Sequence, residues 1–242
     1  TIKYLKNNLN NFSKEDIAAG IQKITDKLIT KQVSYFYNKY KIPNICLVGG
    51  LHANVLSNSK ILHINNNLKL FVFPNMSDGG LAFGAAGLIH KKYNNFFKKM
   101  KINNFYFGDS FHNEEIEKFL QKSNIKYKKI ENIEKKLAEL LSQGNVIARF
   151  SGKMEYGPRA LGNRSILYNA KDKSVNLWLN KKLQRTETMP FAPIIQYECA
   201  NDYIDGLKDK DIISAENMTI TMKASDLCRE NSAAAVHVDL TL

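Results

Sequence analysis

The stretch Ser151-Gly-Lys-Met-Glu-Tyr-Gly-Pro-Arg-Ala-Leu-Gly-Asn-Arg-Ser165 is the most informative pattern in this chain. Glycines recur every five residues in it, at Gly152, Gly157 and Gly162, with cationic side chains between them. Glycine lets backbone N–H groups turn toward a bound anion, and arginine supplies planar pairs of donors. The stretch therefore predicts an anion-binding loop, with a salt-bridged structural loop as the alternative. Its single acid, Glu155, is a candidate internal partner that would orient an arginine.

The distribution of arginine supports the anion-binding interpretation. Only five of the 35 basic residues are arginine, and four of the five lie at Arg149, Arg159, Arg164 and Arg185. Lysine cannot replace arginine where a phosphate or carboxylate is bound by two parallel hydrogen bonds. A chain that otherwise uses lysine is thus predicted to keep arginine where geometry requires it.

Composition narrows the class of protein. The net charge of +12 comes from lysines spread along the chain, which is typical of a solvated surface, so nucleic-acid binding is not expected. The hydrophobic content of 44% predicts a globular core, and no run of 18 apolar residues suggests a membrane span. Three widely spaced cysteines predict free thiols in a cytoplasmic protein. The first residues lack both Met and a signal peptide, which suggests a cut N-terminus.

Helices and strands are expected to alternate, which predicts an α/β fold. Helices are expected at 13–40, where Ser13 begins a capping box, and at 53–59, 80–90, 113–120, 133–141 and 174–183. Strands are expected at 44–48 (buried), 69–73, 125–130, 145–150, 191–196, 218–222 and 234–238. The lysine-rich segment 91–101 is a candidate linker. The small residues of helix 80–90 predict close packing against a sheet or another helix.

Two further segments place glycines at the end of an expected strand. Gly49-Gly50 precede a helix start, an arrangement that favours a nucleotide phosphate but also occurs at ordinary strand-to-helix corners. His52 in this turn is expected to be a structural polar residue. Asp78 precedes Gly79-Gly80, where it is either a metal ligand beside a phosphate or the cap of the next helix.

Together these residues resemble a known family. The loop 151–165 with Ile166-Leu167 is similar to the signature of the carbamoyltransferases related to nodulation and antibiotic-tailoring enzymes. Val48-Gly-Gly-Leu-His-Ala-Asn-Val-Leu-Ser-Asn58 resembles their GG-x-x-x-N-x-x-x-N segment. Phe73-Pro-Asn-Met-Ser-Asp-Gly-Gly-Leu-Ala-Phe-Gly-Ala-Ala86 resembles their Asp-Gly segment, and Pro190–Pro193 and His237-Val-Asp239 follow in the expected order.

The resemblance implies a two-module protein. Residues 1–100 would be the second lobe of an actin-like, Kae1-type ATPase domain, and residues 101–242 a YrdC-like domain with some α+β character, truncated at its end. The implied reaction uses ATP and carbamoyl phosphate to make carbamoyl-adenylate and passes the carbamoyl group to a hydroxyl. The implied acceptor is a sugar or small natural product. No membrane partner is implied, and a homodimer is left open.

Site residues follow from the same resemblance. Gly49, Gly50 and Asn54 would line the adenylate site, and Asp78 would bind a divalent metal, expected to be iron(II), with Mg²⁺ accompanying the nucleotide as an alternative. The residues implied for the carbamoyl-phosphate and adenylate region, expected to be catalytic, are Lys153, Arg159, Arg164, Ser165 and Arg185.

The chain departs from the family pattern in places. No two histidines four apart occur, although the family's metal site uses such a pair in an upstream lobe, and Leu240-Thr-Leu242 follows Asp239 where the family has Gly-Thr. Thr186 and Thr188-Met189 also replace usual residues, so only Arg185 transfers near this segment. Two other hypotheses remain open: threonylcarbamoyl transfer to tRNA, and a ligand-binding remnant without activity.

Overall fold

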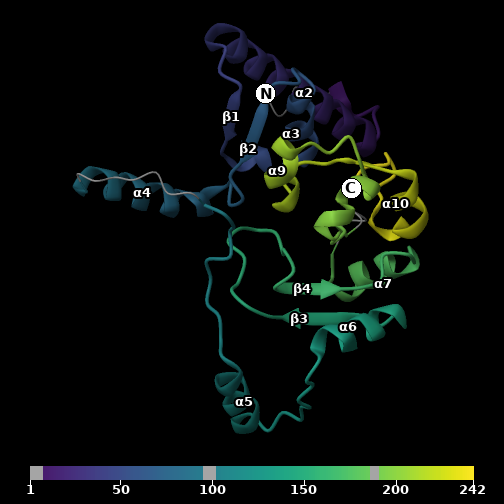
Figure 1. Ribbon diagram of the computed structural model, residues 1–242. Coiled ribbons are helices and arrows are strands. Elements are labelled where there is room, and N and C mark those ends of the chain that lie inside the picture. Colours follow the sequence, from purple (N-terminus) through teal and green to yellow (C-terminus); the bar gives the residue numbers. More distant parts are fainter. Residues whose placement is uncertain (1–7, 95–101, 186–190) are drawn as a thin grey trace.

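A computed structural model describes residues 8–94, 102–185 and 191–242 (Figure 1). The α/β fold class is confirmed, with α+β character after residue 102 because the strands there pair antiparallel. The main helices are α2 (Lys14–Tyr40), α3 (Val55–Leu62), α4 (Leu81–Tyr93), α5 (Asn113–Lys122), α6 (Ile133–Ser142), α7 (Ser174–Lys182), α8 (Ala200–Tyr203), α9 (Ile212–Glu216) and α10 (Asp226–Asn231). The strands are β1 (Asn44–Leu47), β2 (Lys69–Val72), β3 (Ile147–Phe150), β4 (Arg164–Leu167), β5 (Ile204–Asp205) and β6 (Lys223–Ala224). Short 3-10 turns are η1 (Gly50–Ala53), η2 (Asp78–Gly80), η3 (Tyr197–Cys199), η4 (Asp209–Asp211) and η5 (Ala233–Ala235).

The hydrophobic core lies around the parallel pair β1–β2, where Asn44 pairs with Lys69 and Leu47 with Val72. Helix α2 begins where predicted, because the Ser13 hydroxyl accepts a hydrogen bond from the Asp16 N–H. The core members from the helices, strands and neighbouring loops are Ile29, Val33, Leu47, Ile61, Leu68, Leu70, Val72, Met76 and Ile220. We call this assembly the β1–β2 unit.

The predicted strand 44–48 is shorter and more exposed than expected. It ends at Leu47, the one residue of β1 that is buried, and the next residue, Val48, is 65% exposed. Within the described residues β1 pairs along one edge only, with β2, so its remaining side chains are not enclosed.

Residues 209–222 return to the β1–β2 unit from the far end of the sequence. The Ser214 hydroxyl donates to the Leu70 carbonyl oxygen at 2.8 Å, and the Asn58 amide donates to the Thr219 carbonyl oxygen at 2.8 Å. The predicted strand 218–222 is wrong, because Thr221 bonds to the Ser59 hydroxyl of α3 rather than to a strand. The expected division at residue 100 stays a prediction.

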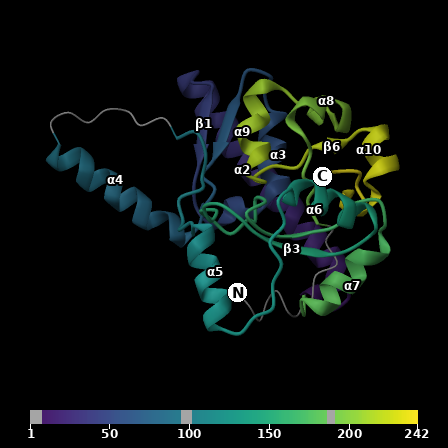
Figure 2. The same ribbon diagram turned by 60° about the horizontal axis from the view of Figure 1, so that its bottom comes forward.

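Helix α4 contradicts the packing expected of it. None of its residues is buried, a Cβ added at Gly84 or Gly87 would meet nothing within 4 Å, and the helix extends away from the rest of the chain in both views (Figures 1 and 2). The small residues made the prediction plausible, but no described element lies against them. The helix runs to Tyr93, so the first residues of the candidate linker are helical, and 95–101 lie outside the described residues.

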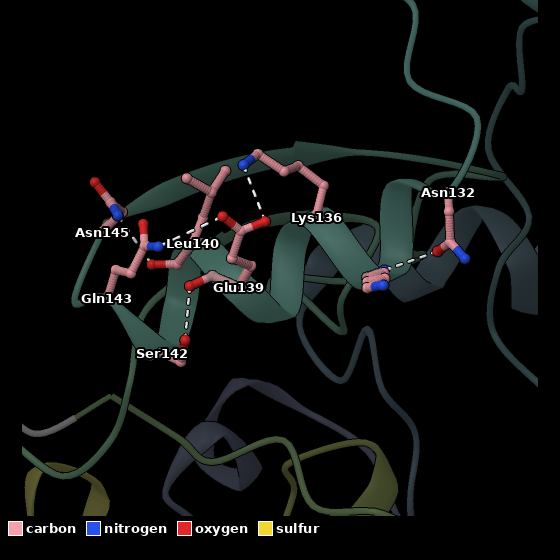
Figure 3. Close-up of polar contacts among 8 residues, drawn as sticks. Asn132, Lys136, Glu139, Leu140, Ser142, Gln143 and Asn145 are labelled. Carbon is pink, nitrogen blue, oxygen red and sulfur yellow. Dashed lines mark hydrogen bonds and ion pairs between the residues drawn. The ribbon is translucent and has the colours of Figure 1, made fainter.

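Helices α5, α6 and α7 confirm the predictions closely. The Asn132 side chain caps α6 by accepting from the Lys135 N–H at 2.9 Å, and Lys136 forms an ion pair with Glu139 one turn on, at 3.0 Å (Figure 3). Strand β3 follows and pairs antiparallel with β4, so that Arg149 lies opposite Ser165.

Three other predicted strands are wrong. Segments 125–130 and 191–196 form no strand, and 234–238 begins as the turn η5. At η5, Ala234 exchanges hydrogen bonds with Ala170 and Asn176 around α7. Apolar composition alone made these segments resemble strands, but each lacks a partner strand in the described chain.

The described residues contain no helix long and apolar enough to cross a membrane. The three cysteines are free, as predicted.

Candidate functional site

The carboxyl ends of β1 and β2 place two glycine-containing turns side by side. The Gly49 N–H donates to the Met76 carbonyl oxygen at 2.6 Å, and a Cβ on Gly50 would lie 3.3 Å from the Ser77 hydroxyl. Gly49 has a φ of 108°, a conformation open to glycine and strained for other residues. Ligands of parallel α/β sheets bind at this edge, so the position of Gly49 and Gly50 agrees with a ligand-binding role.

The Gly-rich loop (151–165) is organised around a buried carboxylate. Glu155 is 7% exposed, and one of its oxygens accepts from the backbone N–H groups of Leu161, Asn163 and Arg164 at 2.9, 2.7 and 3.1 Å. Burial alone would raise the pKa of Glu155, but these N–H groups and its own hold the pKa below the ordinary 4.5. The predicted pairing of Glu155 with an arginine side chain is wrong, because backbone amides occupy the carboxylate.

The Arg164 guanidinium also binds the backbone of the same loop. Its guanidinium carbon lies 3.6 Å from the centroid of the Phe150 ring, and it donates to four backbone carbonyl groups at 2.8–3.3 Å. Its acceptors belong to Ser151, Asn163, Asp109 and Gly152. The geometry gives Arg164 a structural part in the loop, and its role toward an anion stays a prediction.

The Gly-rich loop contacts both strand-end turns. Arg159 Nη2 donates to the Ala53 carbonyl oxygen at 3.2 Å, while its Nε is buried without a partner among the described residues. The Tyr156 hydroxyl donates to the Gly79 carbonyl oxygen at 2.9 Å, and a Cβ on Gly157 would lie 3.0 Å from the Pro74 carbonyl oxygen. Three segments that were separate in the sequence therefore form one junction, with Arg159 as its cation.

A cluster of aromatic side chains packs around Tyr156 at the junction. The Tyr156 ring lies 5.7–6.2 Å from the ring centroids of Phe73, Phe83 and Phe107. Phe73 and Phe107 also pack on Phe105, which is nearly completely buried. Such edge and tilted contacts each stabilise the pair beyond the burial of apolar area. The cluster therefore holds the Gly-rich loop against the end of β2.

Segment 105–109 is a part of the site that sequence reasoning missed. The Tyr156 N–H donates to the Phe105 carbonyl oxygen at 2.7 Å, and the Gly108 N–H donates to the Met154 carbonyl oxygen at 3.0 Å. A Cβ on Gly108 would lie 2.6 Å from the Met154 Cβ, so glycine permits this close approach. The detectable signal was a run of three consecutive aromatic residues, 105–107, followed by Gly108.

Asn54 is bound by residues of α2 that were also missed. Its side chain caps α3 by accepting from the Ser57 N–H and donates to Gln22 Oε1 at 2.8 Å. Gln22 and Ser57 both donate to Asp26, at 2.8 and 2.6 Å. His52 binds Asn58 at 2.9 Å, as expected of a structural residue. The adenylate contact expected of Asn54 stays a prediction.

Asp78 begins η2 and is exposed. Its side chain makes no cap bond to η2 or α4, so the capping alternative is wrong. The described residues hold no group of three His, Cys, Asp or Glu side chains that could bind a metal ion. Asp78 thus has too few companions in the described chain to assign a metal, and its iron(II) or Mg²⁺ role stays a prediction.

The remaining predicted residues lie on the Gly-rich loop or just beyond α7. Lys153 is exposed on the Gly-rich loop, and its carbonyl oxygen accepts from the Asn163 amide. The Ser165 hydroxyl accepts from the Gly162 N–H at 2.9 Å. Arg185 lies just beyond α7, with its guanidinium carbon 5.1 Å from the centroid of the Phe191 ring. These contacts of Arg185 lie outside the Gly-rich loop.

The fold and the junction define an α/β protein in which a glycine-rich loop packs against the ends of two parallel strands. Residues 3–87 match the family model described as carbamoyltransferase N-terminus, and residues 138–242 match the one described as carbamoyltransferase C-terminus. The chain belongs to the carbamoyltransferase family.

Its relatives come from archaea and bacteria. An uncharacterized protein of Methanocaldococcus jannaschii is 35% identical over 98% of this chain and 45% of its own length. Nodulation protein NolNO of Sinorhizobium fredii is 26% identical over 94% of the chain and 34% of its own length. Nodulation protein U of Azorhizobium caulinodans is 30% identical over 81% of the chain and 32% of its own length. The chain thus spans less than half the length of these relatives.

Proposed function

We propose that this chain carries the donor-binding part of an ATP-dependent O-carbamoyltransferase. Carbamoyl phosphate and ATP would give carbamoyl-adenylate, with one water consumed and phosphate and pyrophosphate released. A hydroxyl oxygen of a sugar or natural product would then bond to the carbamoyl carbon. AMP would leave, and the hydroxyl proton would pass to solvent.

The bond between Arg159 and Ala53 is the observation that carries this proposal. It joins the Gly-rich loop of one family segment to the glycine turn of the other. It also places at the meeting point a guanidinium whose buried Nε has no hydrogen-bond partner among the described residues. An anion bound there would meet a cation already held in place, which stabilises charge on phosphate oxygens at little reorganisation cost.

The glycine turns at the strand ends also favour a bound nucleotide. Gly49 and Gly50 leave backbone accessible beside Ser77, which suits the close approach of a nucleotide phosphate. Lys153 lies two residues before Glu155 and is exposed, so it would add a mobile positive charge. No step is assigned to a metal, since Asp78 lacks sufficient companion ligands among the described residues.

Isothermal titration of the chain with carbamoyl phosphate tests the proposal. We expect saturable binding that weakens at least about tenfold in Arg159→Ala, since a lost charge-assisted hydrogen bond costs on the order of 1.5–3 kcal/mol. Arg229→Ala is the matched control, because Arg229 lies in α10 and pairs with Asp226.

Two results would contradict the proposal. One is the absence of binding by the unmutated chain, and the other is equal weakening in the Arg159 and Arg229 variants. Pyrophosphate release from ATP by a full-length relative, dependent on carbamoyl phosphate, tests the adenylate step separately. Retention of tRNA at physiological salt would instead favour threonylcarbamoyl transfer.

A further inference from the structure

Two tyrosine hydroxyls tie the Gly-rich loop to its surroundings at different places. Tyr106 reaches into the loop and donates to the Leu161 carbonyl oxygen at 3.0 Å. Tyr156 reaches out of the loop and donates to the Gly79 carbonyl oxygen at 2.9 Å. Tyr106 thus fixes the loop to segment 105–109, while Tyr156 fixes it to η2, which carries Asp78.

The Tyr156 ring is held as firmly as its hydroxyl. It contacts Phe73 after β2, Phe83 in α4 and Phe107, with centroid distances of 6.1, 6.2 and 5.7 Å. Phe73 and Phe83 lie on either side of η2 in the sequence, and their rings are 5.3 Å apart. A displacement of the Tyr156 ring therefore disturbs the packing at both ends of the segment that contains η2.

The loop backbone on both sides of Tyr156 is held by contacts of its neighbours. The adjacent residue Glu155 binds three backbone N–H groups on the far limb of the loop, and the following residue Gly157 lies against Pro74. Movement of residues 161–164 is consequently transmitted through the Glu155 carboxylate to Tyr156. Chains of packed side chains and hydrogen bonds of this kind carry energetic coupling between sites.

We propose that Tyr156 is a positioning residue that couples the Gly-rich loop to the backbone of Asp78–Gly80. An anion that orders the loop thereby orders η2, and a ligand at η2 orders the loop in return. The identity of the anion rests on the proposed function, whereas the coupling itself does not. Carbamoyl phosphate and inorganic phosphate are the probes.

Hydrogen exchange of the ligand-free chain, followed by mass spectrometry, is the first test. The Gly80 and Leu81 N–H groups are hydrogen-bonded to Ser77 and Asp78, so their exchange reports on η2. Tyr156→Phe keeps the ring and removes the hydroxyl, and we expect η2 to exchange about five- to tenfold faster, with a smaller increase at 161–165.

Tyr106→Phe is the matched control. It removes the other hydroxyl bond, so we expect faster exchange mainly at 161–165, with a smaller increase at η2 than in Tyr156→Phe. Equal exchange at η2 in the unmutated chain and Tyr156→Phe would overturn the coupling. Faster exchange spread over β1 and β2 in Tyr156→Phe would also overturn it, because that pattern marks general loosening.

Exchange with a saturating anion is the second test. In the unmutated chain, carbamoyl phosphate should slow exchange at both 161–165 and η2, whereas in Tyr156→Phe only 161–165 should slow. Equal slowing of η2 in both proteins would overturn the coupling. If neither segment slows in the unmutated chain, the donor-binding proposal fails, and the ligand-free comparison still decides the role of Tyr156.

Discussion

The β1–β2 unit and the Gly-rich loop each bury a carboxylate, and they do so in opposite ways. In the loop, Glu155 accepts three backbone N–H bonds, and its pKa falls below the ordinary value. Beside β2, Asp211 is 5% exposed, one of its oxygens has no hydrogen-bond partner among the described residues, and burial raises its pKa. The ionised carboxylate therefore stabilises the folded loop but destabilises the fold beside β2. The difference arises because hydrogen bonds compensate for burial only in the loop.

The two regions also differ in what holds them together. The β1–β2 unit contains most of the buried apolar side chains, whereas no residue of β3 or β4 is buried. The loop instead depends on Glu155 and Arg164, which bind backbone groups. Substitutions in the unit should therefore unfold the chain, and substitutions in the loop should act mainly on the candidate site.

The largest expected effect is that of Leu70→Ala. Leu70 is 2% exposed in the core, and truncation of such a leucine costs about 2–5 kcal/mol of unfolding free energy. Urea denaturation followed by circular dichroism measures it. Leu88→Ala in the exposed α4 is the matched control, with an expected change within about 0.5 kcal/mol. Similar losses in both variants would contradict the contrast between the unit and α4.

Glu155→Gln comes next. The amide keeps the shape but loses the charge, and we expect the loop to be destabilised by about 1–3 kcal/mol, seen as faster hydrogen exchange at 161–164. Because folding lowers the pKa of Glu155, its stabilisation is present above about pH 4.5 and is lost as the pH falls through the lower folded pKa. Identical acid dependence of loop exchange in both proteins would be evidence against the role of this carboxylate. Glu139→Gln on exposed α6 serves as the control.

Asp211→Asn should act in the opposite direction. Folding raises the pKa of Asp211, so its protonated form favours folding below about pH 3.8, and this contribution disappears as the pH rises through the folded pKa. The neutral side chain should therefore raise stability at pH 7 by about 1 kcal/mol, the lower cost of an unsatisfied buried polar group. The difference in thermal midpoint should vanish in acid. A variant less stable than the unmutated chain at pH 7 would remove the contrast with Glu155.

Lys136→Ala should have the smallest effect. Its ion pair with Glu139 spans one turn of α6 on the surface (Figure 3), and such pairs contribute at most about 0.5 kcal/mol. Added salt should reduce even this difference in urea denaturation. A loss comparable with that of Leu70→Ala would mean that surface charge, rather than burial, stabilises this part of the chain.

Local signals in the sequence predicted the helices well. Ser13 begins α2 as expected, and α6 and α7 lie within a residue or two of their predicted bounds, because caps and apolar spacing act within a few residues. Strand predictions failed at 125–130, 191–196, 218–222 and 234–238, because a strand needs a distant partner. The exposure of α4 could not be predicted either, because small residues show that close packing is possible but not that a neighbouring element exists.

The sequence predicted where the candidate site lies, but not the hydrogen bonds that form it. Glycine and arginine spacing identified the Gly-rich loop, and the family resemblance connected it with Gly49 and Asp78. The partners of Glu155 and Arg164 are backbone groups, which every residue carries, so sequence could not single them out. The contact of Arg159 with Ala53 spans 106 residues and depends on the folded chain.

The return of residues 209–222 to the β1–β2 unit bears on how the chain is made. Asn58 and Thr219 are 161 residues apart, and the bonds between Ser59 and Thr221 span 162. A ribosome produces the chain from the N-terminus, so α3 leaves it long before its partners exist. The β1–β2 unit completes its core only when almost all of these 242 residues have been synthesised. Until then the part of its apolar surface that Ile220 covers lacks this partner, and chaperones are the cellular factors suited to cover it.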